Sequence, residues 1–378
     1  MSAAAQSPLQ YFGRAWRIEL DTADGSQYVV SSDQFSEALR ATFTVEMYAL
    51  QAYGRATVTL YNLDNSIAGQ VAAGAPNVGN LWKFNQAVTA GNTVKISAGY
   101  KQSADGAFDP GPSLIYTGTV FQPIWTRENV VDYKLILRCV TALFSDMFNF
   151  ASFPVAGGST AFDILTQLCS PAKANIPIEN IDAQAQQKLS QATLPRAQGI
   201  HGRPGDIIRQ TVKQQNLLWW ISPNGLNIRS FSVANAAPPD FSYGPPNLPG
   251  SNANQSANAG TIRTTLIGVP EQTQQGVLFR VLLDSDVKIG SIVKLAPGTI
   301  INAYQFQYGS GLPAVPNQTG TYVVVGVRHF GDTRGGGDDW YTEVNALTMD
   351  FFANWLGALT PGQVAAIQSA AGAAAGAA

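Results

Sequence analysis

The chain has 378 residues, of which 13% are charged, 10% are aromatic and 45% are hydrophobic. This length predicts two or three domains of roughly 100–200 residues each. The net charge of -2 excludes the electrostatic footprint of a protein whose main ligand is nucleic acid. So few charges predict a neutral polar surface, which suits a protein largely covered by partners, because amides and hydroxyls cost less to desolvate than charges do. The alternative is a domain that simply has few Lys and Glu residues.

The beginning of the chain carries no readable targeting signal. Residues 1–8 contain neither the basic region nor the apolar region of a signal peptide. Nowhere does an uninterrupted apolar stretch reach the roughly 18 residues that a membrane-spanning helix needs. We therefore expect a soluble chain without membrane insertion. Cys139 and Cys169 lie in apolar periodic segments, so we expect buried thiols rather than a disulfide scaffold.

Residues 1–150 are predicted to form an N-terminal β-barrel domain. Apolar residues alternate with polar ones over several short segments, which gives each strand one wet and one dry face. The alternating residues are Ile18 and Leu20; Phe43, Val45 and Met47; Val58 and Leu60; and Val94, Ile96 and Ala98. Two longer segments, residues 114–127 and 130–140, have the spacing of a hairpin. Many short strands with close turns predict a barrel or a sandwich.

Residues 151–234 are predicted to form a small α+β domain. Thr160 and Asp163 have the spacing of a helix cap, and apolar residues then recur at helical intervals. A second helix is expected over residues 204–215, and the polar stretch 182–191 between them is expected to be a short helix with its loop. Asn224-Gly225 between two apolar runs predicts a hairpin over residues 217–229.

The rest of the chain is predicted to return to β structure. Residues 235–260 are rich in Pro, Asn, Gly, Ser and Ala, and we interpret them as a linker. Residues 261–350 are predicted to form a second β-barrel domain, and residues 351–378 a short helix, capped at Thr360, with an Ala-rich tail. The predicted fold class is mainly β, with two β-barrel or sandwich modules on either side of a helix-helix-hairpin domain. No internal sequence repeat is visible.

The residues that most often carry chemistry are scarce and scattered. Gly335 to Gly337 lead into a strand rather than a helix, so they predict a tight turn and not a phosphate loop. His201 and His329 are far apart and lack metal-ligand spacing, so structural roles are expected. No catalytic residue, metal ligand or cofactor-binding residue is predicted.

Two further groups of side chains were weighed. Asp284 and Asp286, like Asp338 and Asp339, could form a carboxylate pair for sugar hydrolysis, but their position at strand exits favours turns held by side-chain to backbone hydrogen bonds. Adjacent residues on a strand point to opposite faces, so Trp219-Trp220 predicts one core residue and one at an interface rather than a carbohydrate platform.

The order of several motifs resembles bacteriophage tail baseplate hub proteins. The C-terminal resemblance covers residues 266–270, 276–283, 288–295 and 320–334: Ile-Gly-x-Pro, a strand into Leu-Leu-Asp, Lys-x-Gly-Ser, and Gly-x-Tyr-x-Val before His-x-Gly-Asp-Thr-Arg. The N-terminal segments 18–20 and 58–63 resemble the first barrel of the same family. The middle unit is similar to the family's inserted domain.

The resemblance implies a structural protein of the virion and not an enzyme. In that family the protein is a homotrimer whose two tube-like barrels per chain present six barrels to the sixfold tail tube, while the remainder matches the threefold spike. The implied partners are the tail tube protein, the spike protein, the wedge proteins and the C-terminus of the tape-measure protein, and the implied location is the tail baseplate after assembly in the host cytoplasm. No hydrolase domain or glycine-repeat needle is recognisable. The alternative is a virion-associated peptidoglycan hydrolase that uses Asp284, Asp286, Asp338 or Asp339.

Overall fold

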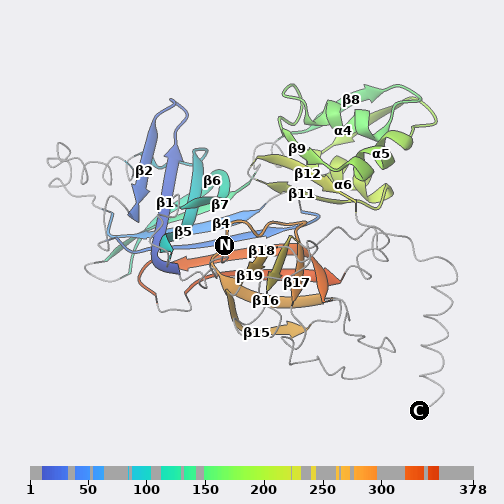
Figure 1. Cartoon of the computed structure of the whole chain (residues 1–378). Helices are drawn as coiled ribbons and strands as arrows, with labels where there is room; N and C mark the ends of the chain where they lie inside the picture. The colour runs from blue at the N-terminus through green and yellow to red at the C-terminus, as the bar shows by residue number, and fades with distance from the viewer. Residues whose placement is uncertain are drawn as a thin grey trace, which may run out of the picture.

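The protein is mainly β, with three helices in the part of the chain that is described. The computed structural model describes residues 11–32, 39–51, 54–63, 84, 87–103, 112–128, 132–141, 149–222, 224–230, 240–243, 261–263, 265–272, 276–295, 320–335 and 339–348. Asp338 and the cap expected at Thr360 lie outside these residues. The α+β unit lies beside the large sheet, at the upper right of Figure 1.

The first β segment follows the predicted alternation. Ile18, Leu20, Val45, Val58 and Leu60 are buried while their neighbours along each strand face outward. The predicted hairpin is confirmed as the pair β6–β7. The strands are β1 (Tyr11–Asp21), β2 (Gln27–Ser31), β3 (Ala41–Tyr48), β4 (Arg55–Tyr61), β5 (Thr93–Ser103), β6 (Ser113–Arg127) and β7 (Tyr133–Val140).

The middle unit contains the three predicted helices and the predicted hairpin. Thr160 and Asp163 form a reciprocal capping box, and Asp182 accepts a hydrogen bond from the Ala185 N–H at the start of the next helix. The elements are β8 (Ala151–Val155), α4 (Ala161–Cys169), β9 (Ile178–Ile181), α5 (Ala183–Gln191), β10 (Gln198–Gly202), α6 (Pro204–Gln214), β11 (Leu218–Ser222) and β12 (Gly225–Arg229). The sequence did not indicate β8, β9 or β10, because β9 and β10 are largely exposed and lack an apolar alternation.

Among its described residues the second β segment contains seven strands, one of them inside the expected linker. Residues 241–243 of the linker range form a strand whose Tyr243 is 1% exposed and packs against Phe279 with ring centroids 5.5 Å apart. The linker prediction is wrong at these residues. It was based on the overall composition of a polar stretch, to which two aromatic residues contribute little. The strands are β13 (Phe241–Tyr243), β14 (Thr261–Arg263), β15 (Leu266–Gln272), β16 (Gly276–Leu282), β17 (Ile292–Leu295), β18 (Thr321–Asp332) and β19 (Trp340–Thr348).

The buried apolar residues form three clusters, one in each of these segments. The division is not complete, because Leu283 and Trp340 from the second β segment belong to the cluster of the first. The Trp340 ring lies edge-on to Phe43 with centroids 5.2 Å apart, and its Nε1 donates to the Gly99 carbonyl at 3.2 Å. The two β segments therefore share part of their core.

The two β segments also share one sheet. The second half of β18 pairs antiparallel with β3, from Gly326 opposite Tyr48 to Asp332 opposite Thr42, and this joins all fourteen strands of the large sheet. Side chains support the junction, since Arg328 pairs with Glu46 at 3.3 Å and Arg40 with Asp332 at 2.7 Å. Figure 1 shows β18 between the strands of the two segments.

The two β segments repeat one strand order. The first runs β3-β4-β7-β6-β5-β1-β2 and the second runs β15-β16-β19-β18-β17-β13-β14, so that strands in the same place correspond. The first five strands of each order are antiparallel throughout. The pairs next to β1 are antiparallel, however, whereas those next to β13 are parallel. We call each set of five antiparallel strands a module.

The repeat extends to single residues. Gly91 N–H donates to the Val120 carbonyl and Val120 N–H to Asn92, while Gly290 N–H donates to the Val324 carbonyl and Val324 N–H to Ser291. Both glycines have a positive φ, of 96° and 84°. The pair Val94-Lys95 begins two residues after Asn92, and the pair Val293-Lys294 begins two residues after Ser291, in the same register. The repeat is not visible in the sequence because the two modules share register and turns rather than side chains.

Candidate interaction sites

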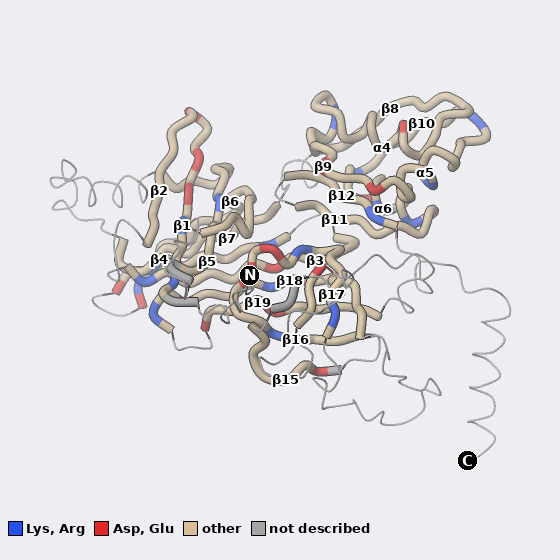
Figure 2. Tube along the Cα trace, viewed as in Figure 1, with Lys and Arg blue, Asp and Glu red and all other residues tan. Residues whose placement is uncertain are grey.

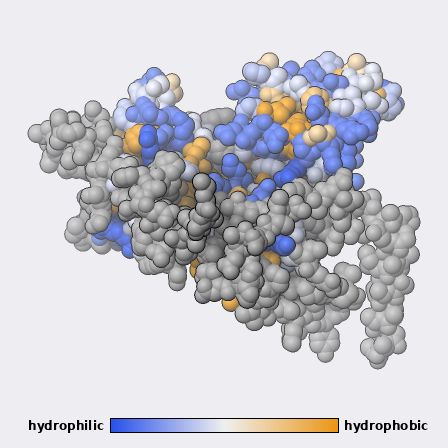
Figure 3. Space-filling model, viewed as in Figure 1, coloured by the Kyte–Doolittle hydropathy of each residue, from blue (hydrophilic) through white to orange (hydrophobic). Residues whose placement is uncertain are grey.

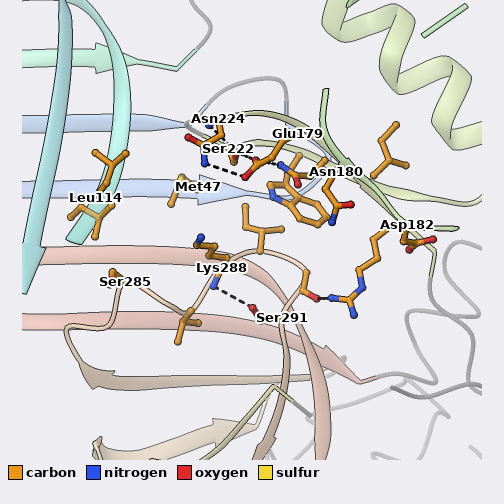
Figure 4. A pocket seen from close by; sticks show the side chains of 18 of the residues that line it. Met47, Leu114, Glu179, Asn180, Asp182, Ser222, Asn224, Ser285, Lys288 and Ser291 are labelled. Carbon is orange, nitrogen blue, oxygen red and sulfur yellow. Dashed lines mark hydrogen bonds between the residues drawn. The ribbon is translucent and has the colours of Figure 1, made fainter. Parts of the chain in front are cut away.

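A pocket of about 590 Å³ lies where the α+β unit meets the large sheet. Its walls come from β9, from the β11–β12 hairpin and from the turn at residues 287–291 that precedes β17. Figure 4 shows Glu179, Ser222 and Asn224 on one side and Ser285, Lys288 and Ser291 on the other. The pocket is thus formed by segments that are far apart in the sequence.

Glu179 is the most heavily hydrogen-bonded acid of this pocket. Its carboxylate accepts hydrogen bonds from the Ser222 hydroxyl and from the Nδ2 atoms of Asn227, at 2.6 Å, and Asn224, at 3.2 Å. Burial raises the pKa of Glu179, but these three donors and the positive charge of Lys288 outweigh it and leave the pKa lowered. A carboxylate held in this way ties β9 to the hairpin and is poorly placed to act as a base.

A close contact fixes the α+β unit against the second β segment. Gly290 has a φ of 84°, and a Cβ atom at this position would lie 2.5 Å from the Trp220 ring. Arg229 donates to the Gly290 carbonyl at 2.6 Å. Trp219 is 1% exposed in the middle core, whereas Trp220 packs against the core of the second β segment. The prediction of one core and one interface tryptophan is confirmed.

The histidines and cysteines have structural surroundings. His329 is 1% exposed, its Nδ1 lies 2.9 Å from the Thr342 hydroxyl, and burial lowers its pKa to about 4. His201 lies on β10 with its side chain exposed. Cys139 and Cys169 are buried free thiols, as predicted, and burial raises the pKa of each to about 12. Neutral imidazole and protonated thiols in such places do not form a nucleophile and base pair.

The candidate carboxylates occupy turns in the described residues. Asp284 Oδ1 accepts the Asp286 N–H at 3.0 Å, which is the side-chain to backbone hydrogen bond expected of a turn after β16. Asp339 directly precedes β19, and its side chain lies beside Gly335. Among the described residues, no group of three or more His, Cys, Asp or Glu side chains is arranged to hold a metal ion, and no helix is long and apolar enough to cross a membrane.

Several large apolar side chains are exposed along the β6–β7 hairpin. Phe121 is 50% exposed, Trp125 51% and Tyr133 44%. Trp125 and Tyr133 line a hollow of about 350 Å³ with Arg127, whose guanidinium lies over the Tyr133 ring at 4.6 Å. The alternation of these strands was read from the sequence, but nothing in it showed that the hairpin extends past the core.

Charge is sparse over the described surface. Figure 2 shows Lys, Arg, Asp and Glu as isolated positions along the trace, and the coloured, described part of the face in Figure 3 is mostly hydrophilic with some hydrophobic patches. The surface therefore offers polar and aromatic contacts rather than a field of one sign, which is typical of protein partners more than of nucleic acid.

Comparisons with known proteins find similar folds but no sequence relatives. No family model matches the chain, and no curated protein matches its sequence. A 43 kDa tail protein of prophage MuSo2 from Shewanella oneidensis is 10% identical with a TM-score of 0.47, over 89% of this chain and 99% of that one. A tail protein from Neisseria meningitidis MC58 is 12% identical with a TM-score of 0.49, over 90% and 98%.

A third similar structure is the E. coli c3393 protein, described as a type VI secretion component with structural similarity to the T4 tail proteins gp27 and gp5. It is 9% identical with a TM-score of 0.44, over 82% of this chain and 73% of that one. The structural neighbours are thus phage tail proteins and a relative from a secretion system. Likeness at this level decides nothing about function.

Proposed function

We propose that this chain is the structural baseplate hub of a phage tail. It acts as a homotrimer that joins the sixfold tail tube to the threefold spike and contacts the wedge proteins and the tape-measure C-terminus. Its place is the tail baseplate of the virion, after assembly in the host cytoplasm. It catalyses no reaction and carries no cofactor.

The observation that carries this proposal is the repeated module. Two sets of five strands with one order and one register lie side by side in a single sheet. Three copies supply six such modules, which matches a sixfold ring while the rest of the chain keeps threefold symmetry. The motif order of the sequence, which resembles tail hub proteins, supports the same function independently.

The rival function, a peptidoglycan hydrolase, finds no support in the described residues. Asp284 and Asp286 form a turn, and Glu179 of the 590 Å³ pocket is held by three side-chain donors. A hydrolase of this kind needs two carboxylates on either side of a substrate bond. The carboxylates at hand instead stabilise local structure.

The proposal is tested by two measurements on the full-length chain. Light scattering coupled to gel filtration gives the mass of the purified protein, and we expect that of a trimer. Electron microscopy of tails labelled with an antibody to this chain should place it at the end of the tube next to the spike. A stable monomer that is absent from tails contradicts the proposal.

A further inference from the structure

The junction inside the chain uses one particular edge of a module. The first half of β18, around Val323, pairs with β17, and the second half, from Gly326 to Asp332, pairs on that same edge with β3. A bulge between Val324 and Gly326 separates the halves. One long strand thus belongs to its own module at its start and reaches the other module at its end.

β6 holds the corresponding place in the first module. Ser113 to Thr119 pair with β5, a bulge follows between Val120 and Gln122, and the later residues pair with β7. β5 ends before it reaches residues 122–127. On that edge of β6, no strand of the described residues pairs with them. This is the edge that β18 uses to reach β3.

β15 holds the place of β3. In the described part of the chain it pairs with β16 alone, just as β3 pairs with β4 on its inner side. Its outer edge corresponds to the edge of β3 that accepts β18. Each copy therefore has two strand edges, one on β6 and one on β15, that correspond to the edges of β18 and β3 that pair within the chain.

We propose that Trp125 to Glu128, at the end of β6, pair antiparallel with β15 of a neighbouring copy, in the arrangement that joins β18 to β3 within the chain. This inference rests on the proposed function, because a contact between two different surfaces closes only in a ring such as the trimer. Junctions within chains and between chains then alternate around the ring.

The registers fix which residues meet. Within the chain, Phe330 of β18 lies opposite Thr44 of β3. The registers of the corresponding strands β7 and β19 show that Thr126 holds the place of Phe330, and those of β4 and β16 show that Glu271 holds the place of Thr44. Thr126 of one copy would therefore lie opposite Glu271 of the next. By the same steps Glu128 lies opposite Ile267. The intervening residues of β15 form an irregularity opposite β16, so the ladder between copies is interrupted there.

Exposure differs between the two junctions as this pairing requires. His329, in the place of Trp125, is 1% exposed where β18 pairs with β3, whereas Trp125 is 51% exposed. Phe43 is 2% exposed, whereas Val269 in the corresponding part of β15 is 51% exposed. A neighbouring copy would remove both apolar side chains from water, which stabilises the contact.

Charge and edge chemistry agree with the pairing. Glu271 of one copy would stand in one row across the sheet with Thr126 and Lys134 of the next, which brings opposite charges to the same face. Pro123 and Pro270 lack an N–H, and prolines at a strand edge limit pairing with unrelated strands. The two edges thus suit each other better than they suit a random partner.

Disulfide trapping between two single variants tests this register. Thr126→Cys and Glu271→Cys proteins are purified separately, mixed, allowed to exchange and oxidised, and covalent dimers are expected only in the mixture, because opposite residues on paired strands bring their Cβ atoms within about 4.5–5.5 Å. The native Cys139 and Cys169 are buried. The double variant Glu46→Cys/Arg328→Cys is the matched control, since this pair across the internal junction should crosslink at monomer mass.

A second variant reads the contact without crosslinking. Val269→Asp puts a charge on an exposed site, so the circular dichroism spectrum should stay unchanged while the mass falls from trimer to monomer. Glu128→Cys mixed with Ile267→Cys repeats the trapping at a second position of the same register.

Each alternative outcome has a distinct meaning. A trimer that forms no crosslink at either pair and tolerates Val269→Asp overturns the strand pairing but leaves the proposed function intact. Crosslinked dimers of Thr126→Cys alone indicate that like edges meet, and they also overturn the pairing. A chain that stays monomeric at every concentration and is absent from tails overturns the proposed function together with the pairing.

Discussion

Replacing Trp340 with alanine should destabilise both β segments at once. The side chain is 1% exposed and lies in the core of the first segment although it begins β19 of the second. Burial of a tryptophan removes about 200 Å² from water, which at about 25 cal/mol per Å² sets an upper limit near 5 kcal/mol. The variant also loses the hydrogen bond from Nε1 to the Gly99 carbonyl. Measured truncations of buried aromatic residues cost roughly 3–5 kcal/mol, so we expect a loss of about 4 kcal/mol.

Urea unfolding followed by circular dichroism measures this loss as a change in the free energy of unfolding. Protein concentration must be equal for all variants, because association adds to apparent stability. The control is Phe150→Ala, whose side chain is 64% exposed and whose removal should change stability by less than about 0.5 kcal/mol. A loss below about 1 kcal/mol for Trp340→Ala would refute the shared core.

Three further predictions concern other parts of the chain. Burial lowers the pKa of His329 from 6.5 to about 4. The unfolded state therefore binds a proton first, and the free energy of unfolding should fall as pH drops below 6.5, by about 2 kcal/mol at pH 5. Urea midpoints at pH 7 and pH 5 measure this loss, and an equal loss of stability in a His329→Asn variant contradicts it. Gly290→Ala should lower the free energy of unfolding by about 1–3 kcal/mol, because the new Cβ meets the Trp220 ring at a positive φ. Gly25→Ala is the control, since the space around its Cβ is open and only the positive φ has a cost. Equal losses of stability in thermal melts of the two variants would refute the ring contact. Zymograms should show no clearing of cell-wall substrate, and clearing that disappears in Asp284→Asn or Asp286→Asn would restore the hydrolase hypothesis.

Local features of the fold could be read from the sequence because their causes are local. The capping box of Thr160 and Asp163 and the turn at Asn224-Gly225 depend on a few adjacent residues. The alternation in β3 and β4 follows from one buried face. These elements were confirmed, with boundaries shifted by a few residues.

Long-range features could not be read in this way. The pairing of β3 with β18 joins segments about 280 residues apart, and either strand alone shows only that one face is buried. The hydrogen bonds of Glu179 depend on β9 lying parallel to β12, a contact for which four largely exposed residues give no pattern. The repeated module was invisible because Val-Lys and a glycine turn are too short to stand out, and only the registers reveal their equivalence.

The seam between β18 and β3 consists of seven residue pairs along two antiparallel strands. Their hydrogen bonds lie across the strand direction. Tension parallel to the strands therefore loads every bond simultaneously, whereas tension across them opens the bonds one after another. Mechanically, the two β segments should hold together under a shearing pull and separate first when β3 is peeled away from its end.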